Sequence, residues 1–150
     1  MAYFEKHREP HLISTDPSLI DMDVAHGFLT QTYWAKGISR ERMERAMSNS
    51  LMFGVYLGER RTQIGGARIV TDRATFAYLA DVFIVEKHQG QGLSKWLCES
   101  VFEHPDLQGL RRWILATGDA HTLYEKYGFT ALAEPGRYME KMNHDAYRNG

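Results

Sequence analysis

The sequence has little cysteine and no long apolar run. One cysteine, Cys98, occurs among 150 residues, so no disulfide can form within the chain. Such sparse use of cysteine is typical of a reducing compartment, and we expect a cytoplasmic protein. The apolar stretches are too short and too often interrupted to cross a bilayer. Residues 1–10 carry several charges and no apolar segment, which argues against a secretory signal or a membrane anchor.

An excess of charge of one sign is also missing, because the formal net charge is -1 at pH 7. Nucleic-acid binding usually depends on a basic field, so we expect a small-molecule ligand rather than a nucleic acid. The seven histidines show no HxxxH spacing, and the lone cysteine cannot complete a zinc set. We therefore predict no metal site.

The chain contains four scattered prolines and no repeat, low-complexity tract or Pro/Gly-rich linker. Its length is near the commonest size for one domain, and 43% of its residues are hydrophobic, which is enough to bury a core. We therefore expect residues 1–150 to form a single domain.

Two helices are predicted in the first third of the chain. A short strand over residues 11–15 precedes them and ends at Asp16-Pro17, because the residue before proline avoids the helical conformation. Apolar residues at near-helical spacing then predict a helix from Leu19 to about Tyr33. Ser39 is a suitable N-cap for a second, amphipathic helix.

The middle of the chain changes to the period of strands. Residues 52–57 alternate, and residues 63–70 follow after a polar turn, as in an antiparallel meander. Residues 76–85 are apolar almost throughout, broken mainly by Asp81, so we expect a central strand covered on both faces. The remaining predicted elements are a helix from Leu93 closed by Pro105, a strand over 112–116, a short helix capped by Asp119 and ended by Gly128, and closing strands over 129–132 and 137–142.

A glycine-rich loop separates the apolar strand from the helix that follows it. Gly90 and Gly92 allow the backbone to approach a ligand and to turn its N–H groups toward an anion, at the positive end of the helix dipole. Phosphate is the natural guest, although glycines also serve tight strand-to-helix turns with no ligand. A Walker loop is absent, and a dinucleotide fingerprint would need a third glycine where Lys95 stands.

Two motifs in this chain resemble those of the GNAT superfamily of N-acetyltransferases. The segment over residues 89–94 is similar to the pyrophosphate-binding signature [QR]-x-x-G-x-[GA], departing only where serine replaces glycine or alanine. The segment over residues 120–129, AHTLYEKYGF, looks like the family's A-x-x-L-Y-x-K-x-G-F pattern. A further departure is Thr117, where many members carry an asparagine that touches the cofactor. The residues that the resemblance assigns to pyrophosphate binding are Gln89, Gly90, Gln91, Gly92, Leu93 and Ser94.

The resemblance implies an α/β (α+β) fold, with a mixed, mostly antiparallel central sheet flanked by helices on both faces. It implies an acetyl-CoA-dependent N-acetyltransferase, in which a primary amine of a small molecule attacks the thioester directly and no covalent enzyme intermediate forms. Alternatives are acetylation of protein amino groups and a non-catalytic module that senses acyl-CoA. The resemblance is also compatible with a homodimer, because many members of the family are dimers.

The same resemblance assigns parts of the site to individual residues. Backbone groups of Val82, Phe83 and Ile84 would pair with the pantetheine arm, on a strand that splays from its neighbour. Tyr124 matches the tyrosine that binds the cofactor and protonates the leaving thiolate, or it is an aromatic core residue.

The general base and the acceptor pocket have candidates with open alternatives. Asp81 interrupts an apolar strand and would suit proton removal from an ammonium group, or it only hydrogen-bonds a neighbouring loop. Tyr78 and Glu86 are further candidates for the base. Tyr33 and Trp34 fall where relatives shape the acceptor pocket, but loop aromatics also serve as core anchors.

Overall fold

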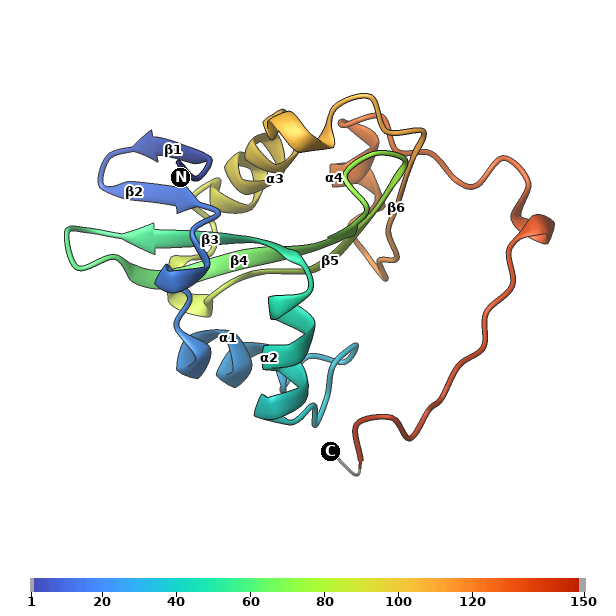
Figure 1. The fold of residues 1–150 in the computed structure, drawn as a ribbon, viewed down its shortest axis with the longest axis horizontal. Coiled ribbons are helices and arrows are strands. Elements are labelled where there is room, and N and C mark those ends of the chain that lie inside the picture. Colours follow the sequence, from blue (N-terminus) through green and yellow to red (C-terminus); the bar gives the residue numbers. More distant parts are fainter. Residues whose placement is uncertain (1, 149–150) are drawn as a thin grey trace.

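One six-stranded sheet organises residues 2–148, the part of the chain described by this computed structural model (Figure 1). Its strands lie side by side in chain order, and every neighbouring pair is antiparallel except the parallel pair β5 and β6. The expected mixed, mostly antiparallel sheet is therefore confirmed. The strands are β1 (Glu5–Arg8), β2 (His11–Ser14), β3 (Leu51–Leu57), β4 (Thr62–Thr71), β5 (Phe76–Ile84) and β6 (Arg112–Ile114).

The first strand, β1, was not predicted from the sequence. Its residues EKHR carry no apolar alternation, because three of the four side chains are exposed. Pairing with β2 forms it, assisted by the Ser14 hydroxyl, which donates to the Glu5 carboxylate at 2.9 Å. The predicted strand over residues 11–15 is confirmed as β2.

Helices cover both faces of the sheet, as expected. Figure 1 shows α1 and α2 on one side and α3 with α4 on the other, so the sheet has two separate cores. Among the described residues, no helix is both long enough and apolar enough to cross a membrane. The helices are α1 (Met22–Leu29), α2 (Arg40–Ser48), α3 (Leu93–Glu103) and α4 (His121–Glu125), with 3₁₀ turns at Pro17–Leu19, Glu86–His88, Pro105–Leu107 and Pro135–Arg137.

The first helix is shorter than the periodicity predicted. The Asp21 carboxylate accepts from the N–H groups of Asp23 and Val24, so α1 begins at Met22 rather than at Leu19. A capping side chain satisfies first-turn amides that have no helical acceptor, and this fixes where a helix starts. The second helix begins as predicted, because the Ser39 hydroxyl accepts from the Arg42 amide.

The strand β5 is not covered on both faces along its whole length, contrary to the prediction. Phe76 and Tyr78 are exposed, whereas the alternate residues Ala77 and Leu79 are buried. No helix covers the outer face of the first half of β5 in the described chain, and that face lines a cleft instead. Only the end of the strand, at Phe83 and Ile84, is buried on both sides.

The predicted cap of the last helix is wrong. Asp119 makes no side-chain cap to α4, and the Thr117 hydroxyl accepts from the Ala120 amide at 3.0 Å instead. Thr117 lies three residues before that amide, which is the spacing of a capping hydroxyl. The helix ends at Glu125, before the predicted Tyr127, and Gly128 has φ of +91°, the left-handed conformation that was predicted for it.

The two predicted closing strands are also wrong. Residues 129–132 and 137–142 form no strand, and the outer edge of β6 has no partner strand among residues 2–148. An alternating pattern makes a strand only where a sheet edge pairs with it, and here neither segment pairs with β6, although Phe129 packs on Trp113 and Tyr138 contacts Arg112.

Candidate functional site

A bulge in β5 directs the Asp81 side chain into the site. Gly66 pairs with Phe83 and Arg68 pairs with Ala80, so two residues of β5, Asp81 and Val82, lie opposite one residue of β4. Asp81 has φ of +51°, in the left-handed region that few residues other than glycine and Asn/Asp adopt. Strained backbone of this kind collects at functional sites, where the surrounding structure holds it.

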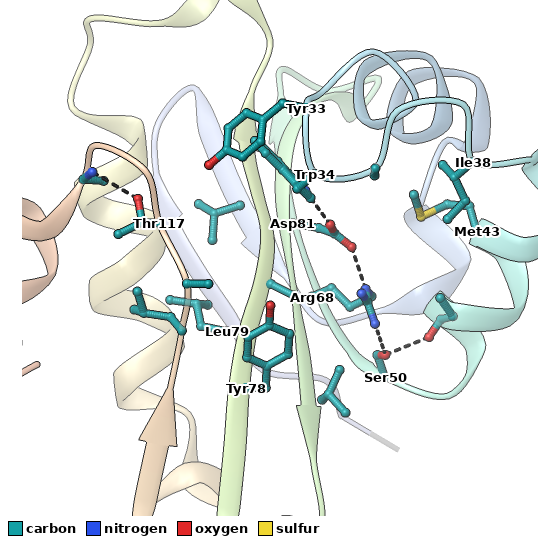
Figure 2. A pocket seen from close by; sticks show the side chains of 18 of the residues that line it. Tyr33, Trp34, Ile38, Met43, Ser50, Arg68, Tyr78, Leu79, Asp81 and Thr117 are labelled. Atoms are coloured by element: carbon teal, nitrogen blue, oxygen red, sulfur yellow. Dashed lines mark hydrogen bonds and ion pairs between the residues drawn. The ribbon is translucent and has the colours of Figure 1, made fainter. Parts of the chain in front are cut away.

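The strands β5 and β6 separate beyond a short parallel contact. They pair only where Phe76–Tyr78 lies beside Arg112–Ile114, and β5 then continues to Ile84 without a neighbour on that side among the described residues. Figure 2 shows the chain after β6 bending away from β5 toward Thr117. The predicted splay is therefore present, and it leaves backbone groups of β5 facing an opening.

A cleft of about 1150 Å³ occupies this opening. It extends from the start of α3 to the helix α2 and the loop that precedes it. Six of the predicted site residues line this one cleft. They are Tyr33, Trp34, Asp81, Val82, Ser94 and Tyr124, and Tyr78, a further candidate for the base, lines it as well.

The glycine loop lies beside this cleft and is open to an incoming anion. Gly90 and Gly92 have φ of +80° and +77°, and no atom outside their immediate chain neighbours lies within 4 Å of a Cβ built at either position. Gly92 is the N-cap of α3 and no side chain caps that helix. The first-turn amides of α3 therefore keep their donors for a ligand, and this arrangement fits a diphosphate.

The Gln89 side chain, which the resemblance assigned to pyrophosphate binding, instead makes a contact within the protein. The Gln89 side-chain amide donates to the Ile84 carbonyl at 2.8 Å, which ties the loop to the end of β5. Leu93 is buried in the core under α3, and Phe83 stacks on Phe28 with ring centroids 4.9 Å apart. Neither side chain lines the cleft, so only the main chain at these positions is placed for a ligand.

Tyr124 reaches the cleft from the short helix α4. Its side chain is 8% exposed and its ring packs edge-on against Phe129, with centroids 5.9 Å apart. Burial, together with the nearby Cys98, raises the pKa of Tyr124 to about 12, so its hydroxyl keeps its proton at neutral pH. Tyr124 lines the cleft, and its phenol proton can be donated to a group bound there.

Asp81 sits at the centre of a polar chain that crosses the acceptor end of the cleft (Figure 2). Its Oδ1 accepts from the indole N–H of Trp34 at 2.8 Å, and its Oδ2 accepts from Nε of Arg68 at 2.6 Å. The Arg68 guanidinium also reaches the Ser50 hydroxyl at 3.4 Å, which in turn donates to the Ala46 carbonyl. The side chains of Asp81 and Arg68 are 6% and 20% exposed, so water screens this pair little.

Arg68 and Ser50 belong to the site although sequence reasoning missed them. Arg68 is the single charge inside the apolar run of β4, the same signal that marked Asp81 in β5. Glu86, a further candidate for the base, is exposed and does not line the cleft.

Tyr33 and Trp34 form the rim of the cleft rather than anchors of the core. They are 75% and 43% exposed, and their rings meet edge-on with centroids 5.1 Å apart. Core anchors would be buried, so these exposures favour a role at the surface of the site.

Comparison with known proteins agrees with this geometry. The model of the acetyltransferase (GNAT) domain matches residues 16–148. A Xanthomonas campestris pv. campestris structure, described as a candidate acetyltransferase of the GNAT family, is 47% identical, with a TM-score of 0.87 over 91% of this chain and 96% of that chain. A candidate acetyltransferase of Gibberella zeae is 33% identical over 79% of this chain and 78% of its own length.

A more distant relative carries a ligand. A GNAT family acetyltransferase from Elizabethkingia anophelis with acetyl-CoA bound has a TM-score of 0.59 at 18% identity, over 92% of this chain and 91% of that chain. At that identity the likeness concerns the fold. Taken together, the family model, the similar sequences and the shared fold show that this chain belongs to the GNAT family of acetyltransferases.

Proposed function

We propose that this protein transfers an acetyl group from acetyl-CoA to the primary amine of a small molecule. The observation that carries this proposal is one cleft, which joins the start of α3, where no side chain caps the helix, to a pocket containing the Asp81 carboxylate and two exposed aromatic rings. The relative from Elizabethkingia anophelis with acetyl-CoA bound supports the choice of acyl donor.

The diphosphate of acetyl-CoA binds at the glycine loop. Amides near Gly90 and Gly92 donate to its oxygens, and the helix dipole of α3 adds about 0.3–1 kcal/mol of favourable electrostatic energy for an anion at an exposed terminus. Serine at position 94 keeps a small side chain at the cleft edge. The loop therefore sets the register of the acyl donor along β5.

Main-chain groups of β5 hold the acyl arm. The Val85 amide donates to the Ile64 carbonyl on β4, and because successive amides of a strand point to opposite edges, the Ile84 amide faces the opening. The Val82 amide faces the same way, two residues earlier. Donors in this position stabilise negative charge that develops on the carbonyl oxygen, an effect worth about 3 kcal/mol at comparable sites.

Asp81 serves as the acceptor of the amine proton. Its carboxylate lies in the cleft wall and pairs with the Arg68 guanidinium. The ammonium form of the acceptor gives up one proton to this carboxylate, directly or through water, and the free amine then attacks the carbonyl carbon. The same carboxylate also holds the indole of Trp34 in position through a hydrogen bond.

Tyr124 supplies the proton that the leaving group needs. As the nitrogen–carbon bond forms, the nitrogen releases its second proton to solvent, and as the carbon–sulfur bond breaks, the electron pair of that bond stays on sulfur. The phenol proton of Tyr124 then neutralises the thiolate, and Tyr124 is restored from solvent. Its raised pKa keeps that proton in place before the thiolate forms.

The acceptor end suits a small amine. Tyr33, Trp34 and Tyr78 present aromatic surface to the cleft, and aromatic faces attract cations as well as apolar groups. A primary ammonium group beside Asp81 would be attracted both by the carboxylate and by the aromatic faces. Amino groups of peptides would have to enter the same cleft, so peptides are the natural comparison in an assay.

The proposal is tested in two steps. Acetyl-CoA at 100 times its dissociation constant should stabilise the protein by about 2.7 kcal/mol, measured as a thermal shift. Release of free CoA is then followed with a panel of small primary amines and with lysine-containing peptides. Turnover with small amines and not with peptides supports the proposal. A thermal shift without turnover on either panel would instead identify an acyl-CoA sensor, and no shift would overturn acetyl-CoA binding.

A further inference from the structure

The helix α2 turns a basic face toward the cleft. Its sequence, RERMERAMS, contains three arginines and two glutamates. Arg42 and Arg45 line the cleft, whereas Glu41 and Glu44 do not. Arg40, which does not line the cleft either, pairs with Glu44 at 3.4 Å. No acidic side chain of α2 therefore offsets the positive charge on the side of the helix that faces the cleft.

The guanidinium of Arg45 makes no ion pair and no hydrogen bond with the described part of the chain. Its main-chain carbonyl, by contrast, accepts from the Ser48 hydroxyl at 2.9 Å and from the Asn49 side-chain amide at 2.8 Å. The Ala46 carbonyl accepts from the Ser50 hydroxyl at 2.7 Å. These carbonyls near the end of α2 already have donors, so they offer less attraction to a cation. The group that this end of the helix presents to the cleft is the cation of Arg45.

A second guanidinium in the cleft, that of Arg68, has N–H groups left over. Arginine carries five N–H donors. Nε donates to Asp81 at 2.6 Å and Nη1 donates to the Ser50 hydroxyl at 3.4 Å, and the other donors have no partner in the described chain (Figure 2). The side chain is only 20% exposed, so water reaches it in part. A half-buried cation with unused donors favours an anion beside it, and the planar fork of arginine fits carboxylate and phosphate oxygens.

The charges at this end of the cleft do not balance. Arg45 and Arg68 bring two positive charges, and Asp81 is the one carboxylate beside them among the described lining residues. The other lining carboxylate, Asp119, belongs to the segment after β6, which Figure 2 shows on the far side of the cleft at Thr117. An ammonium group alone would therefore enter a region with an excess of positive charge. An amine that also carries an anion would not.

The floor of the cleft beside Arg68 is apolar. Val70 follows two residues later on β4 and pairs with Tyr78 of β5. Both side chains line the cleft and are 39% and 36% exposed, which leaves apolar surface uncovered in the described chain. A short hydrocarbon chain on the acceptor would cover this surface and gain from its burial.

We propose that the acceptor amine carries an anionic group, a carboxylate or a phosphate, which binds the guanidinium groups of Arg68 and Arg45. The ammonium group of the same molecule lies beside Asp81, so the acceptor resembles an amino acid, with its two charges separated by a few bonds. This inference rests on the proposed acetyl transfer and names the class of amine that the cleft receives. The diphosphate of acetyl-CoA does not compete, because it is assigned to the start of α3, at the other end of the cleft.

Paired acceptors test the proposal first. Each pair shares a carbon skeleton and differs in the anion: α-amino acids against their amides, ω-amino acids against alkylamines, and aminoalkyl phosphates against amino alcohols. We expect CoA release to give a kcat/KM at least about tenfold higher for the anionic member of the best pair, because charge-assisted hydrogen bonds are the strong ones. The carboxylate and phosphate pairs together show which anion is preferred.

The variant Arg45→Gln should reduce this preference about tenfold, because one charged contact to the anion is lost. Its folding is not at risk, since Arg45 is exposed and its guanidinium has no partner in the described chain. The matched control is Arg60→Gln, which removes the same charge from an exposed turn between β3 and β4, outside the cleft. Arg60→Gln should keep the preference of the wild type.

Binding is measured separately, in the complex with CoA, which has no acetyl group to transfer. Calorimetry should show tighter binding of the anionic member of a pair, and Arg45→Gln should weaken that binding while the dissociation constant of acetyl-CoA stays the same. Absence of turnover with every amine, while calorimetry still shows preference for the anion, would overturn the acetyl transfer and leave the anion site standing.

Three results would overturn the anion site. Neutral amines that are bound and acetylated as well as their anionic counterparts show that no anion is recognised, and acetyl transfer then stands alone. If Arg45→Gln lowers stability but not the preference, Arg45 only complements the helix dipole of α2. If it weakens acetyl-CoA instead, the arginine serves the acyl donor.

Discussion

Asp81 and Arg68 form an ion pair across the bulge between β5 and β4, with Nε of Arg68 2.6 Å from Oδ2 of Asp81. The same carboxylate accepts from the indole of Trp34, which is 47 residues away in the sequence. One side chain therefore joins two strands and the rim of the cleft. It is also the only acidic group in this polar chain, and so it is the natural acceptor of a proton there.

Replacing this carboxylate should affect both stability and rate. In Asp81→Asn, the Arg68 charge loses its partner while an amide oxygen remains for Trp34, so we expect the free energy of unfolding to fall by about 1.5–3 kcal/mol. If Asp81 takes the amine proton, kcat/KM should fall by about 10²-fold or more. Urea unfolding and CoA release measure the two effects.

The matched control is Trp34→Phe, which removes the indole N–H donor and keeps a smaller aromatic ring at the rim. If Asp81 accepts the proton, Trp34→Phe should keep most of kcat, and mainly the KM for the amine should change. Equal losses of kcat in Asp81→Asn and Trp34→Phe would mean that Asp81 acts through the position of Trp34 and not on the proton.

Removal of the Tyr124 hydroxyl should slow the reaction without weakening binding. Tyr124→Phe keeps the ring against Phe129 and removes only the hydroxyl, so stability should change by less than about 1 kcal/mol. We expect kcat to fall by about 10²-fold while the acetyl-CoA dissociation constant, measured by calorimetry, is unchanged.

The pH profile gives a second test of Tyr124. Because its pKa is raised to about 12, its proton is retained on raising the pH to 10, and this residue should cause no fall in kcat up to that pH. Full activity of Tyr124→Phe with a competent amine would show that another group protonates the thiolate.

Substitution of the loop glycine should separate binding from folding. Gly92 has φ of +77°, and a valine there is strained by about 1–2 kcal/mol and projects into the space offered to the diphosphate. We expect Gly92→Val to lose acetyl-CoA binding in a thermal-shift titration while the protein remains folded.

Gly58 provides a control with the same backbone strain. It has φ of +74° and the same open space, but it lies in the turn after β3, away from the cleft. Gly58→Val should lose similar stability and keep its affinity for acetyl-CoA. Equal affinity in the two variants would place the cofactor elsewhere.

His104 should make stability depend on pH. Burial lowers its pKa below the ordinary value, and its Nδ1 accepts from the Asp106 amide at 3.0 Å. Above about pH 6.5 it is neutral whether the chain is folded or unfolded, and the full stabilisation is present. As the pH falls below that value, the unfolded chain binds a proton that the folded chain resists, so stability decreases.

His104→Asn isolates this effect, because an asparagine oxygen can accept the same amide hydrogen bond but does not titrate. We expect the free energy of unfolding of the wild type to fall more steeply than that of the variant between pH 7 and pH 5. Parallel profiles would show that other groups cause the acid sensitivity.

The sequence was most informative where local chemistry decides the structure. The glycine loop, the start of α2 at Ser39 and the left-handed Gly128 follow from short-range rules, and all three were predicted. The cap of α4 was mispredicted because two side chains, Asp119 and Thr117, compete within a few residues, and only three-dimensional geometry chooses between them.

Long-range contacts were the part that the sequence could not supply. The ion pair between Arg68 and Asp81 depends on a register shift at the bulge, which no pattern in either strand reveals. The strand over residues 137–142 was predicted from its alternation, yet a strand exists only beside an edge, and the edge is a property of the assembled sheet. The alternation indicates a tendency to form a strand, and only a neighbouring strand at a sheet edge would realise it.

Hydrogen exchange measured with and without acetyl-CoA tests the central claim most directly. Binding along β5 with the diphosphate at the start of α3 predicts slower exchange at the amides of residues 82–84 and 90–94, with no change in the turn around Gly58. Exchange that stays the same in both of these segments, or protection confined to another face of the protein, would contradict the account.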